Sequence, residues 1–402
     1  SYSGDWILRI ALPVTVYKMT GSASAISLLF IAYAIPSIVL GSVAGVFVDR
    51  WERRRLMVIT NVLMGLAVLP LIAVQSSAWL WLIYLAAFAE SAVGQFFGPS
   101  ENAMLPLLVE EKQLGSANAL NILNNNLARF IGAGIGGVIV GTLGLEGAVI
   151  LDALTYFMAA GLVALISVTS KPNVQEQAAH ALDAIKKVGQ DWRIGIRFVR
   201  HEPVVRLLFL STVLMAIGEG TIGVLFAPFV LDVLKGGEAG VGALMSAQAI
   251  GGISSGVVVA WIATRAKPSL LCGFGALTFG LIDLVIFNYS TFVEGFAIAI
   301  VLFVLVGIPA AAAMTGLQTI MQLRVPDEVR GRVFGALGTT FGIFTIFGMA
   351  FAGIMSDSLG IVPVLNIQGF AYTTIGIMGL TLLHRQMVEA TPVEAIGEIQ
   401  TA

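Results

Sequence analysis

The stretch GSVAGVFVDRWERRR, residues 41–55, carries an apolar helix directly into a short basic loop. Gly41 and Gly45 stand four residues apart, a spacing that lets a second membrane helix approach closely. Asp49 follows at the membrane surface among four arginines, where it can cap a helix or pair with an arginine from another span. The stretch therefore predicts a membrane helix that ends in an ion pair at Asp49, which must break when the halves of the protein move. The alternative is that the arginines only fix the orientation of the helix in the membrane.

The composition of the whole chain is that of a membrane protein. Of its 402 residues, 57 % are hydrophobic and only 11 % are charged, and the mean hydropathy is +0.92. A soluble domain carries about 25 % charged residues, so most of this surface must be solvated by lipid. The formal net charge of −2 excludes a bulk electrostatic attraction to nucleic acid.

Few residues in the chain are suited to metal binding or covalent chemistry. Cys272 is the only cysteine, and the three histidines, His180, His201 and His384, are scattered. These counts exclude an internal disulfide framework and a cysteine-rich metal site. No Gly-rich phosphate loop occurs, and no nucleophile–histidine–acid set can be assembled. We therefore expect no enzyme, no metal site and no cofactor.

Continuous apolar runs of about 20 residues, the length that crosses a bilayer, predict an all-α protein with twelve transmembrane helices. The first run starts so close to Ser1 that we expect an N-terminal piece to precede it. The expected spans are residues 4–19, 24–48, 56–74, 78–104, 115–141, 147–169, 204–231, 240–263, 269–288, 295–322, 333–355 and 362–383.

The distribution of Lys and Arg orients these spans. In a twelve-span chain Lys18 and Lys235 fall on one side, and Arg9 and Arg129 fall inside spans. The other 18 of the 22 basic residues fall on the opposite side, which the excess of positive charge marks as cytoplasmic. We therefore predict a multi-pass protein with both termini in the cytoplasm.

An internal repeat relates the two halves at an offset of 216 residues. Three small residues in the fifth span recur in the eleventh: Gly132, Gly136 and Gly137 return as Gly348, Ala352 and Gly353. Two parallel six-span halves are the construction that transporters use when one half rocks against the other around a central site.

The repeat divides the chain into two lobes and a connection. We predict an N-lobe over residues 1–170, with its first span clipped, and a C-lobe over residues 203–402 that includes a cytoplasmic tail. The connecting segment, residues 171–202, has apolar residues at helical spacing and several Lys and Arg. It is predicted to be an amphipathic helix on the inner membrane surface, or alternatively a docking site for a partner.

The basic loop resembles the signature loop of the major facilitator superfamily. Five residues carry this resemblance: Gly45, Asp49, Arg50, Arg53 and Arg54. Glu52 stands where that family usually has glycine. Two further loops, residues 99–109 and 327–334, resemble those of a bacterial exporter group that includes macrolide-efflux and enterobactin-exporter proteins. The resemblance covers essentially the whole chain and implies two pseudo-symmetric six-helix lobes in the bacterial cytoplasmic (inner) membrane, with efflux coupled to proton entry.

A glycine-rich stretch in the fifth span resembles the antiporter motif of the same superfamily. Gly132, Gly136 and Gly137 carry it, although Ala133 stands where proline is usual. Glycines at this spacing are expected to pack the two lobes closely together. The alternative is that they form an ordinary small-residue face, which is common in membrane helices.

Ionisable side chains at bilayer depth are costly, so they are functional candidates. The candidates for proton coupling or the substrate cavity are Asp5, Arg9, Glu90, Arg129, Glu219 and Asn125. By resemblance, spans one, four, seven and ten line a central cavity, which places the three acids on cavity helices. An acid in a low-dielectric cavity without a nearby cation favours its protonated form, as a coupling site requires.

Several of these residues have expected partners. Asp5 and Arg9 are spaced i,i+4 and are expected to face each other, and Arg129 is expected to pair with Glu90 or Glu219. The alternative is that these are fixed ion pairs that hold the lobes together. Asn125 either contacts substrate or forms a hydrogen bond between helices.

Together these features predict a secondary active transporter that exports amphipathic or hydrophobic small molecules, of multidrug or macrolide type, by alternating access coupled to protons. Its expected partners are a small amphipathic substrate, protons and membrane lipid, with the chain acting as a monomer. Two alternatives of the same fold are a translocator of lysophospholipid-type lipids and a siderophore exporter. A sensor that does not transport would not need buried acids.

Overall fold

The computed structural model describes residues 1–48, 51–167 and 192–389, and these are almost entirely helical. Ten helices in this part of the chain are long and apolar enough to cross a membrane. Large apolar side chains point outward along them; Met158 and Ile354, for example, are 66 % and 68 % exposed. Helices hydrogen-bond their own backbone, so they can present such surfaces to lipid.

The helices follow one another with short connections. The first half contains α1 (Tyr2–Thr20), α2 (Ala23–Val48), α3 (Arg53–Val68), η1 (Leu69–Ala73), η2 (Ser77–Trp79), α4 (Leu80–Leu108), η3 (Glu111–Gln113) and α5 (Leu114–Ala164). The second half contains α7 (Pro203–Pro228), η4 (Phe229–Val233), α8 (Gly237–Ala263), α9 (Pro268–Asn288), η5 (Tyr289–Thr291), α10 (Phe296–Leu305), α11 (Gly307–Arg324), α12 (Asp327–Leu359), α13 (Ile361–Met378), η6 (Gly379–Leu383) and α14 (His384–Glu389). Between the halves, the described part of the expected linker helix is helical over 192–201, and residues 171–191 lie outside the described residues.

The 51-residue helix α5 turns back on itself at Gly144. This glycine has φ 64° and ψ −163°, a conformation that favours a residue without a Cβ. Residues on both sides of the turn meet the same part of α1, because Gly132 lies against Ser3 while Thr155 lies against Gly4. The ten membrane-length helices count α5 once and leave out α1, so twelve spans remain a prediction.

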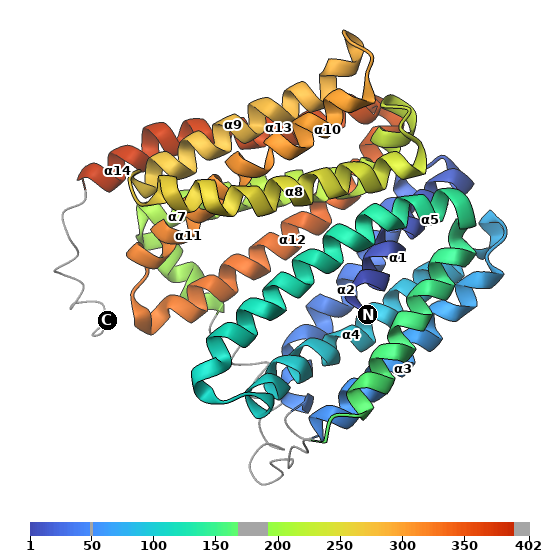
Figure 1. Ribbon diagram of the computed structural model, residues 1–402. Helices are drawn as coiled ribbons and strands as arrows, with labels where there is room; N and C mark the ends of the chain where they lie inside the picture. The colour runs from blue at the N-terminus through green and yellow to red at the C-terminus, as the bar shows by residue number, and fades with distance from the viewer. Residues whose placement is uncertain (49–50, 168–191, 390–402) are drawn as a thin grey trace.

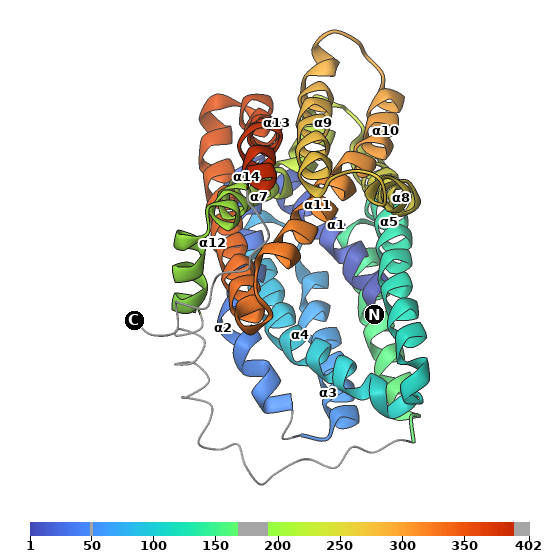
Figure 2. The ribbon, with the colours of Figure 1, turned by 90° about the vertical axis from the view of Figure 1, so that its left-hand side faces the viewer.

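The helices gather into two bundles, one made of α1–α5 and the other of α7–α14 (Figure 1). The bundles meet along two seams, α2 against α12 and α5 against α8, which lie on opposite sides of the molecule (Figure 2). Helices α1 and α7 lie between the seams and also contact each other. The lobe boundaries themselves remain a prediction.

Glycine lets α5 and α8 approach to backbone contact. A Cβ on Gly137 would lie 2.7 Å from the carbonyl oxygen of Glu238 and 2.9 Å from the amide nitrogen of Gly242. A Cβ on Gly242 would in turn lie 2.5 Å from the carbonyl oxygen of Ala133. Such contacts leave no room for a side chain, so this seam depends on small residues from both bundles.

Only one of the three glycines expected between the lobes lies there. Gly132 and Gly136 pack against α1, at Ser3 and Ile7, inside the first bundle. The reason is helical geometry: positions 132 and 136 share one face, and position 137 is turned about 100° from position 136. The corresponding glycines of the second half divide in the same way. Gly348, the counterpart of Gly132, packs against Ile217 in its own bundle, and Gly353, the counterpart of Gly137, packs against Ser27 of the other bundle.

Polar contacts join the bundles at one end, which we call the latch end. Three donors of the first bundle meet three acids of the second, in the pairs Tyr17–Asp232, Lys18–Glu238 and Ser24–Asp357. The Ser27 hydroxyl also donates to the carbonyl of Met349, at 2.8 Å. Figure 1 shows α5 and α8 lying together toward this end and diverging away from it.

The basic loop is only partly described. Asp49 and Arg50 lie outside the described residues, and Gly45 lies within α2. Arg53 donates to the carbonyl of Ala103 at 3.1 Å, and Arg54 donates to the carbonyl of Ile166 at 2.6 Å. Both arginines thus bind carbonyls near helix ends within the first bundle, where positive charge is favourable. The proposed lock at Asp49 remains a prediction.

The tight seam predicts that Gly137→Ala opens the latch end. The added methyl group overlaps backbone atoms of Glu238 and Gly242, and overpacking of this kind costs about 1–3 kcal/mol. Because the cost applies only while the seam is closed, the variant should populate molecules with this end apart.

Spin labels can measure this effect. Ser76 and Glu294 are exposed and lie on different bundles beyond the latch end, and Cys272→Ala removes the native thiol. Gly137→Ala should add a longer distance between the labels, whereas Gly161→Ala, where nothing lies within 4 Å of the new methyl group, should not. Identical distance distributions for the two variants would show that the seam does not hold this end closed.

Candidate functional site

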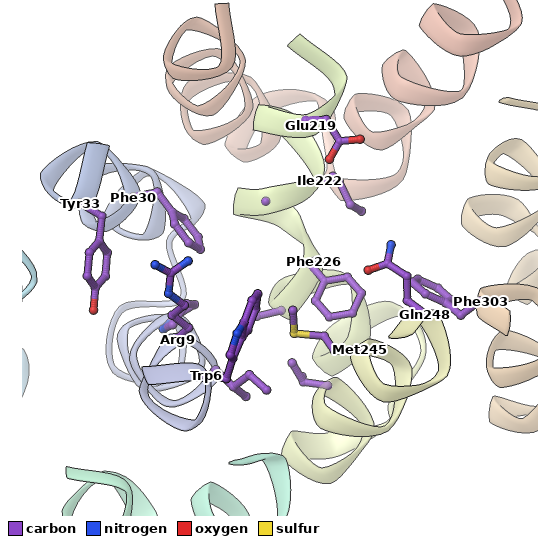
Figure 3. A pocket seen from close by; sticks show the side chains of 15 residues that line it. Trp6, Arg9, Phe30, Tyr33, Glu219, Ile222, Phe226, Met245, Gln248 and Phe303 are labelled. Carbon is purple, nitrogen blue, oxygen red and sulfur yellow. The ribbon is translucent and has the colours of Figure 1, made fainter. Parts of the chain in front are cut away.

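A cavity of about 280 Å³ lies between the two bundles (Figure 3). Its walls combine aromatic and aliphatic side chains with two charged groups from opposite bundles. The lining residues are Trp6, Arg9, Ile10, Pro13, Phe30, Tyr33, Glu219, Ile222, Gly223, Phe226, Ala227, Val241, Met245, Gln248 and Phe303. Mostly apolar walls with a few polar groups are typical of a site for a small molecule.

The helices that line this cavity differ in part from the expected ones. Its walls come from α1, α2, α7, α8 and α10, and none of the described residues of α4 lines it. Glu90 of α4 instead lies behind Tyr33. The Tyr33 side chain lines the cavity, and its hydroxyl donates a hydrogen bond to Glu90. Spans one, seven and ten were expected to line the central cavity, and they do. Span four was also expected to line it, and it does not.

Arg9 points into the cavity instead of pairing with Asp5. Its guanidinium lies 5.4 Å from the centre of the Trp6 ring, and Arg9 is exposed on a helix whose neighbouring residues are largely buried. Among the described residues it forms no ion pair, which corrects the expected Asp5–Arg9 pair. A spacing of i,i+4 places two residues on one helix face, but the long Arg9 side chain follows the indole surface.

Arg129 belongs to the contact between the bundles. Its guanidinium lies 5.2 Å from the centre of the same Trp6 ring, and it donates to the Gln248 side-chain oxygen at 3.0 Å. The expected ion pair with Glu90 or Glu219 is not found in the described part of the chain. Gln248 holds this cation instead, and Trp6 is flanked by two guanidinium groups.

Two tyrosine hydroxyls bind the carboxylate of Glu90, which is 8 % exposed. Tyr33 donates to its Oε2 and Tyr156 donates to its Oε1, both at 3.1 Å. Each oxygen therefore has one donor, although no cation forms an ion pair with this carboxyl among the described residues. Buried acids need such partners, because an unpaired polar group in an apolar interior is costly.

Asp5 and Asp152 surround the same tyrosine. The Asp5 side chain lies close to Tyr156, and its buried Oδ1 has no hydrogen-bond partner among the described residues. The Asp152 carboxyl is fully buried next to Gly4, and neither of its oxygens has a hydrogen-bond partner among the described residues. The first bundle thus encloses three carboxyl groups, contributed by α1, α4 and α5, and the single hydroxyl proton of Tyr156 is donated to one of them, Glu90.

The second bundle carries a smaller version of this arrangement. Tyr372 donates to Oε1 of Glu219 at 2.8 Å, and Glu219 lines the cavity. Asp283 is 4 % exposed and lies beside Gln368. The repeat explains the likeness, because Tyr156 and Tyr372 are 216 residues apart, as are Asp152 and Gln368.

Asn125 stays outside this site. Its side-chain amide donates to the backbone carbonyl of Asn121, one turn earlier in the same helix, at 3.0 Å, and it does not line the cavity. The residues that the sequence analysis missed are Trp6, Tyr33, Tyr156, Tyr372 and Gln248. The repeat of tyrosine at positions 156 and 372 is a signal that could have pointed to two of them.

The arrangement is suited to binding and to proton transfer. A cavity between two bundles that meet at one end, with buried acids beside it, is the arrangement of a membrane transport protein that rocks around a central site. Within the described residues, no group of three His, Cys, Asp or Glu side chains could hold a metal ion.

The chain belongs to the Major Facilitator Superfamily, whose family model matches residues 1–211 and again residues 208–400. It is therefore a multi-pass membrane transporter and not an enzyme. The two matches also mirror the internal repeat, since each covers about one half of the chain.

Named relatives are efflux proteins and transporters of bacteria. An uncharacterised MFS-type transporter of Bacillus subtilis, YfiS, is 26 % identical over 96 % of this chain and 91 % of its own length. Macrolide efflux protein A of Streptococcus pyogenes is 23 % identical over 88 % and 86 %, and multidrug efflux pump Tap of Mycobacterium tuberculosis is 26 % identical over 89 % and 85 %.

Solved structures share the fold. One is a bacterial homologue of the human lysosomal transporter Spinster, with a TM-score of 0.67 and 14 % identity over 96 % of this chain and 92 % of that one. Another is a bacterial homologue of the iron transporter ferroportin, with a TM-score of 0.69 and 16 % identity over 95 % and 96 %. Both are inward-facing.

The hydrogen bond from the Tyr156 hydroxyl to Glu90 leads to a prediction about stability. Tyr156→Phe removes a donor to a buried carboxyl, and a hydrogen bond to a charged group contributes about 1.5–3 kcal/mol. The variant should therefore unfold at a clearly lower temperature in detergent. Tyr84→Phe is the matched control, because its half-buried hydroxyl makes only a 3.3 Å contact to the carbonyl of Ala25. Equal losses in the two variants would contradict a special role for Tyr156.

Proposed function

We propose that this transporter exports amphipathic or hydrophobic small molecules in exchange for protons. The observation that supports this most is the group of buried carboxyls beside the cavity. Asp5, Glu90 and Asp152 lie together in the first bundle, and Glu219 reaches the cavity from the second. Ionisable groups at this depth in a membrane are energetically costly, and in membrane proteins they usually serve a function.

The Tyr156 hydroxyl supports a proton at this site. A tyrosine hydroxyl has one hydrogen, so it can donate to only one carboxylate at a time. Tyr156 donates to Glu90 and so cannot also donate to Asp5, whose buried Oδ1 has no hydrogen-bond partner among the described residues. A proton on Asp5 would remove the charge of this neighbouring carboxyl. The geometry therefore suits an acid pair that holds one proton and releases it when the surroundings change.

Alternating access follows from the position of the contacts between the bundles. The latch end is held by Lys18–Glu238 and its neighbouring pairs, and the seam at Gly137 lies close to it. With the orientation that the basic residues predict, this end is the outer one, and the cavity faces the cytoplasm. Export then requires these contacts to break so that the bundles rock apart at this end.

The relatives agree with the substrate class. Macrolide efflux protein A and multidrug efflux pump Tap carry efflux in their names, and each matches most of this chain. We propose the same broad class for this protein, acting as a monomer in the bacterial cytoplasmic membrane with both termini in the cytoplasm. Two lobes, residues 1–170 and 203–402, would move as the rocking units.

Transport by purified protein in liposomes tests proton exchange. Rhodamine B and rhodamine B ethyl ester serve as amphipathic probes, with protein-free liposomes as the blank. An acidic lumen should drive dye uptake by the wild type. Asp5→Asn, Glu90→Gln and Glu219→Gln remove ionisable groups. We expect Glu90→Gln to lower the gradient-driven rate by about tenfold, which corresponds to about 1.4 kcal/mol of activation free energy.

The control for these variants is Glu146→Gln, because Glu146 is an exposed acid away from the cavity. It should transport like the wild type. Dye uptake that is indifferent to the gradient would overturn proton exchange. Transfer of a lysophospholipid between leaflets without any dye movement would instead favour a lipid translocator.

A further inference from the structure

Two opposite charges face the cavity from different bundles. Arg9 enters from α1 beside Trp6, and Glu219 enters from α7 on the opposite side (Figure 3). They form no ion pair with each other, nor with any other described residue. The cavity is therefore lined by a cation from one bundle and an anion from the other that are not paired with each other.

Both charged groups have hydrogen-bonding capacity left over. A guanidinium has five N–H donors along its edge, and the face-on contact with Trp6 uses none of them. The Glu219 carboxyl accepts from Tyr372 at Oε1, which leaves Oε2 without a hydrogen bond from the described residues. Each group can therefore bind an oppositely charged or polar group of a ligand.

The walls between the charges are apolar. Phe226 and Phe303 pack together with ring centres 5.8 Å apart, and Met245 and Phe30 complete this surface. Near Trp6 the charge is more positive, because the Arg129 guanidinium also lies 5.2 Å from this ring centre, behind the lining residues, and donates to Gln248. The site is thus an apolar slot with a positive wall and a single acid opposite.

We infer that this cavity selects an ampholyte: an amphipathic molecule whose acidic group binds Arg9, whose amine or other cationic group faces Glu219, and whose apolar body fills the aromatic slot. The inference rests on the proposed function, in that it takes the cavity to be the substrate site. It narrows the substrate class from amphipathic compounds in general to those that carry both charges.

Electrostatics distinguishes this class from simple cations and anions. A lone cation would gain from Glu219 but would be brought close to Arg9 and Arg129 in a medium of low dielectric constant, where repulsion is strong. A lone anion would gain from Arg9 and face Glu219. Only a ligand with both charges can pair with Arg9 and with Glu219 and place no charge next to a like charge. Repulsion of the wrong ligands contributes to selectivity as much as attraction of the right one.

A matched pair of dyes tests the ligand class at equilibrium, without a pH gradient. Rhodamine B carries a cationic xanthene and a carboxylate, and its ethyl ester differs only in that the carboxylate is masked. Binding to the full-length protein in dodecylmaltoside micelles is followed by fluorescence anisotropy. The wild type should bind rhodamine B at least about tenfold more tightly than the ester, as expected for one buried charge-assisted pair.

Variants assign that preference to Arg9. Arg9→Gln should abolish the preference, because rhodamine B loses its partner for the carboxylate and the cationic ester loses a repelling charge and binds more tightly. Arg9→Lys should restore part of the preference. Arg265→Gln is the matched control, because Arg265 also lies over a tryptophan, 4.4 Å from the Trp261 ring centre, but on the exposed surface. It should bind both dyes like the wild type. Glu219→Gln should weaken both dyes, since both carry the cationic xanthene.

Three results would overturn the inference: equal or tighter binding of the ester by the wild type, no saturable binding of rhodamine B, or an equal loss of both dyes in Arg9→Gln. The last would mean that Arg9 only compensates the nearby acids. Since the assay contains no gradient, a preference for rhodamine B without gradient-driven transport would reject proton exchange and leave the ligand class standing.

An ampholyte can be a soluble compound or a zwitterionic lipid headgroup, and competition separates the two sources. Lysophosphatidylethanolamine is added to the rhodamine B complex below its micelle-forming concentration. Displacement from the wild type and from Arg265→Gln would assign the site to lipid headgroups. Persistent rhodamine B binding would assign it to soluble ampholytes.

Discussion

The approach of α5 to two neighbours at once is the constraint on which the rest of the structure depends. One face of this helix, at Gly132 and Gly136, lies on the backbone of α1, and the adjoining face, at Gly137, lies on α8 of the other bundle. The first contact lies within one bundle. The second crosses between bundles, so the alternating access proposed above would require the separation of backbones that have no side chains between them.

That packing also creates the polar interior. Gly4 has no side chain, and this allows the part of α5 after Gly144 to place Asp152 against α1, next to Asp5 and Tyr156. The acids are therefore held close by helix packing and not by flexible loops. Of these acids, Glu90 is hydrogen-bonded by two tyrosine hydroxyls, and Arg9, the arginine of α1, lines the cavity without forming an ion pair with any of them.

The architecture could be largely predicted from the sequence, and the site only in part. Long apolar runs indicate membrane helices by simple length, and the glycine repeat at 137 and 353 indicates both seams. Buried acids at positions 5, 90 and 219 stand out because charge is rare in such runs. The donors to Glu90 could not be predicted, since Tyr33 and Tyr156 lie 57 and 66 residues away and meet it only through packing. The direction of Arg9 likewise depends on the Trp6 surface, which periodicity does not reveal.

The unequal walls of the cavity affect how a molecule can sit in it. If the two halves were identical, a half-turn about the axis between them would give every bound molecule a second, equivalent pose. Gly4 packs against Asp152 and Gly218 packs against Gln368, so α1 and α7 correspond at an offset of 214 residues, two fewer than the offset of 216 elsewhere. At this offset Arg9 corresponds to Gly223, and these two residues line the cavity. A guanidinium on one side therefore faces a bare backbone position on the other. This difference removes the degeneracy, so the two poses of a bound molecule with distinct ends would differ in energy and one direction would be preferred.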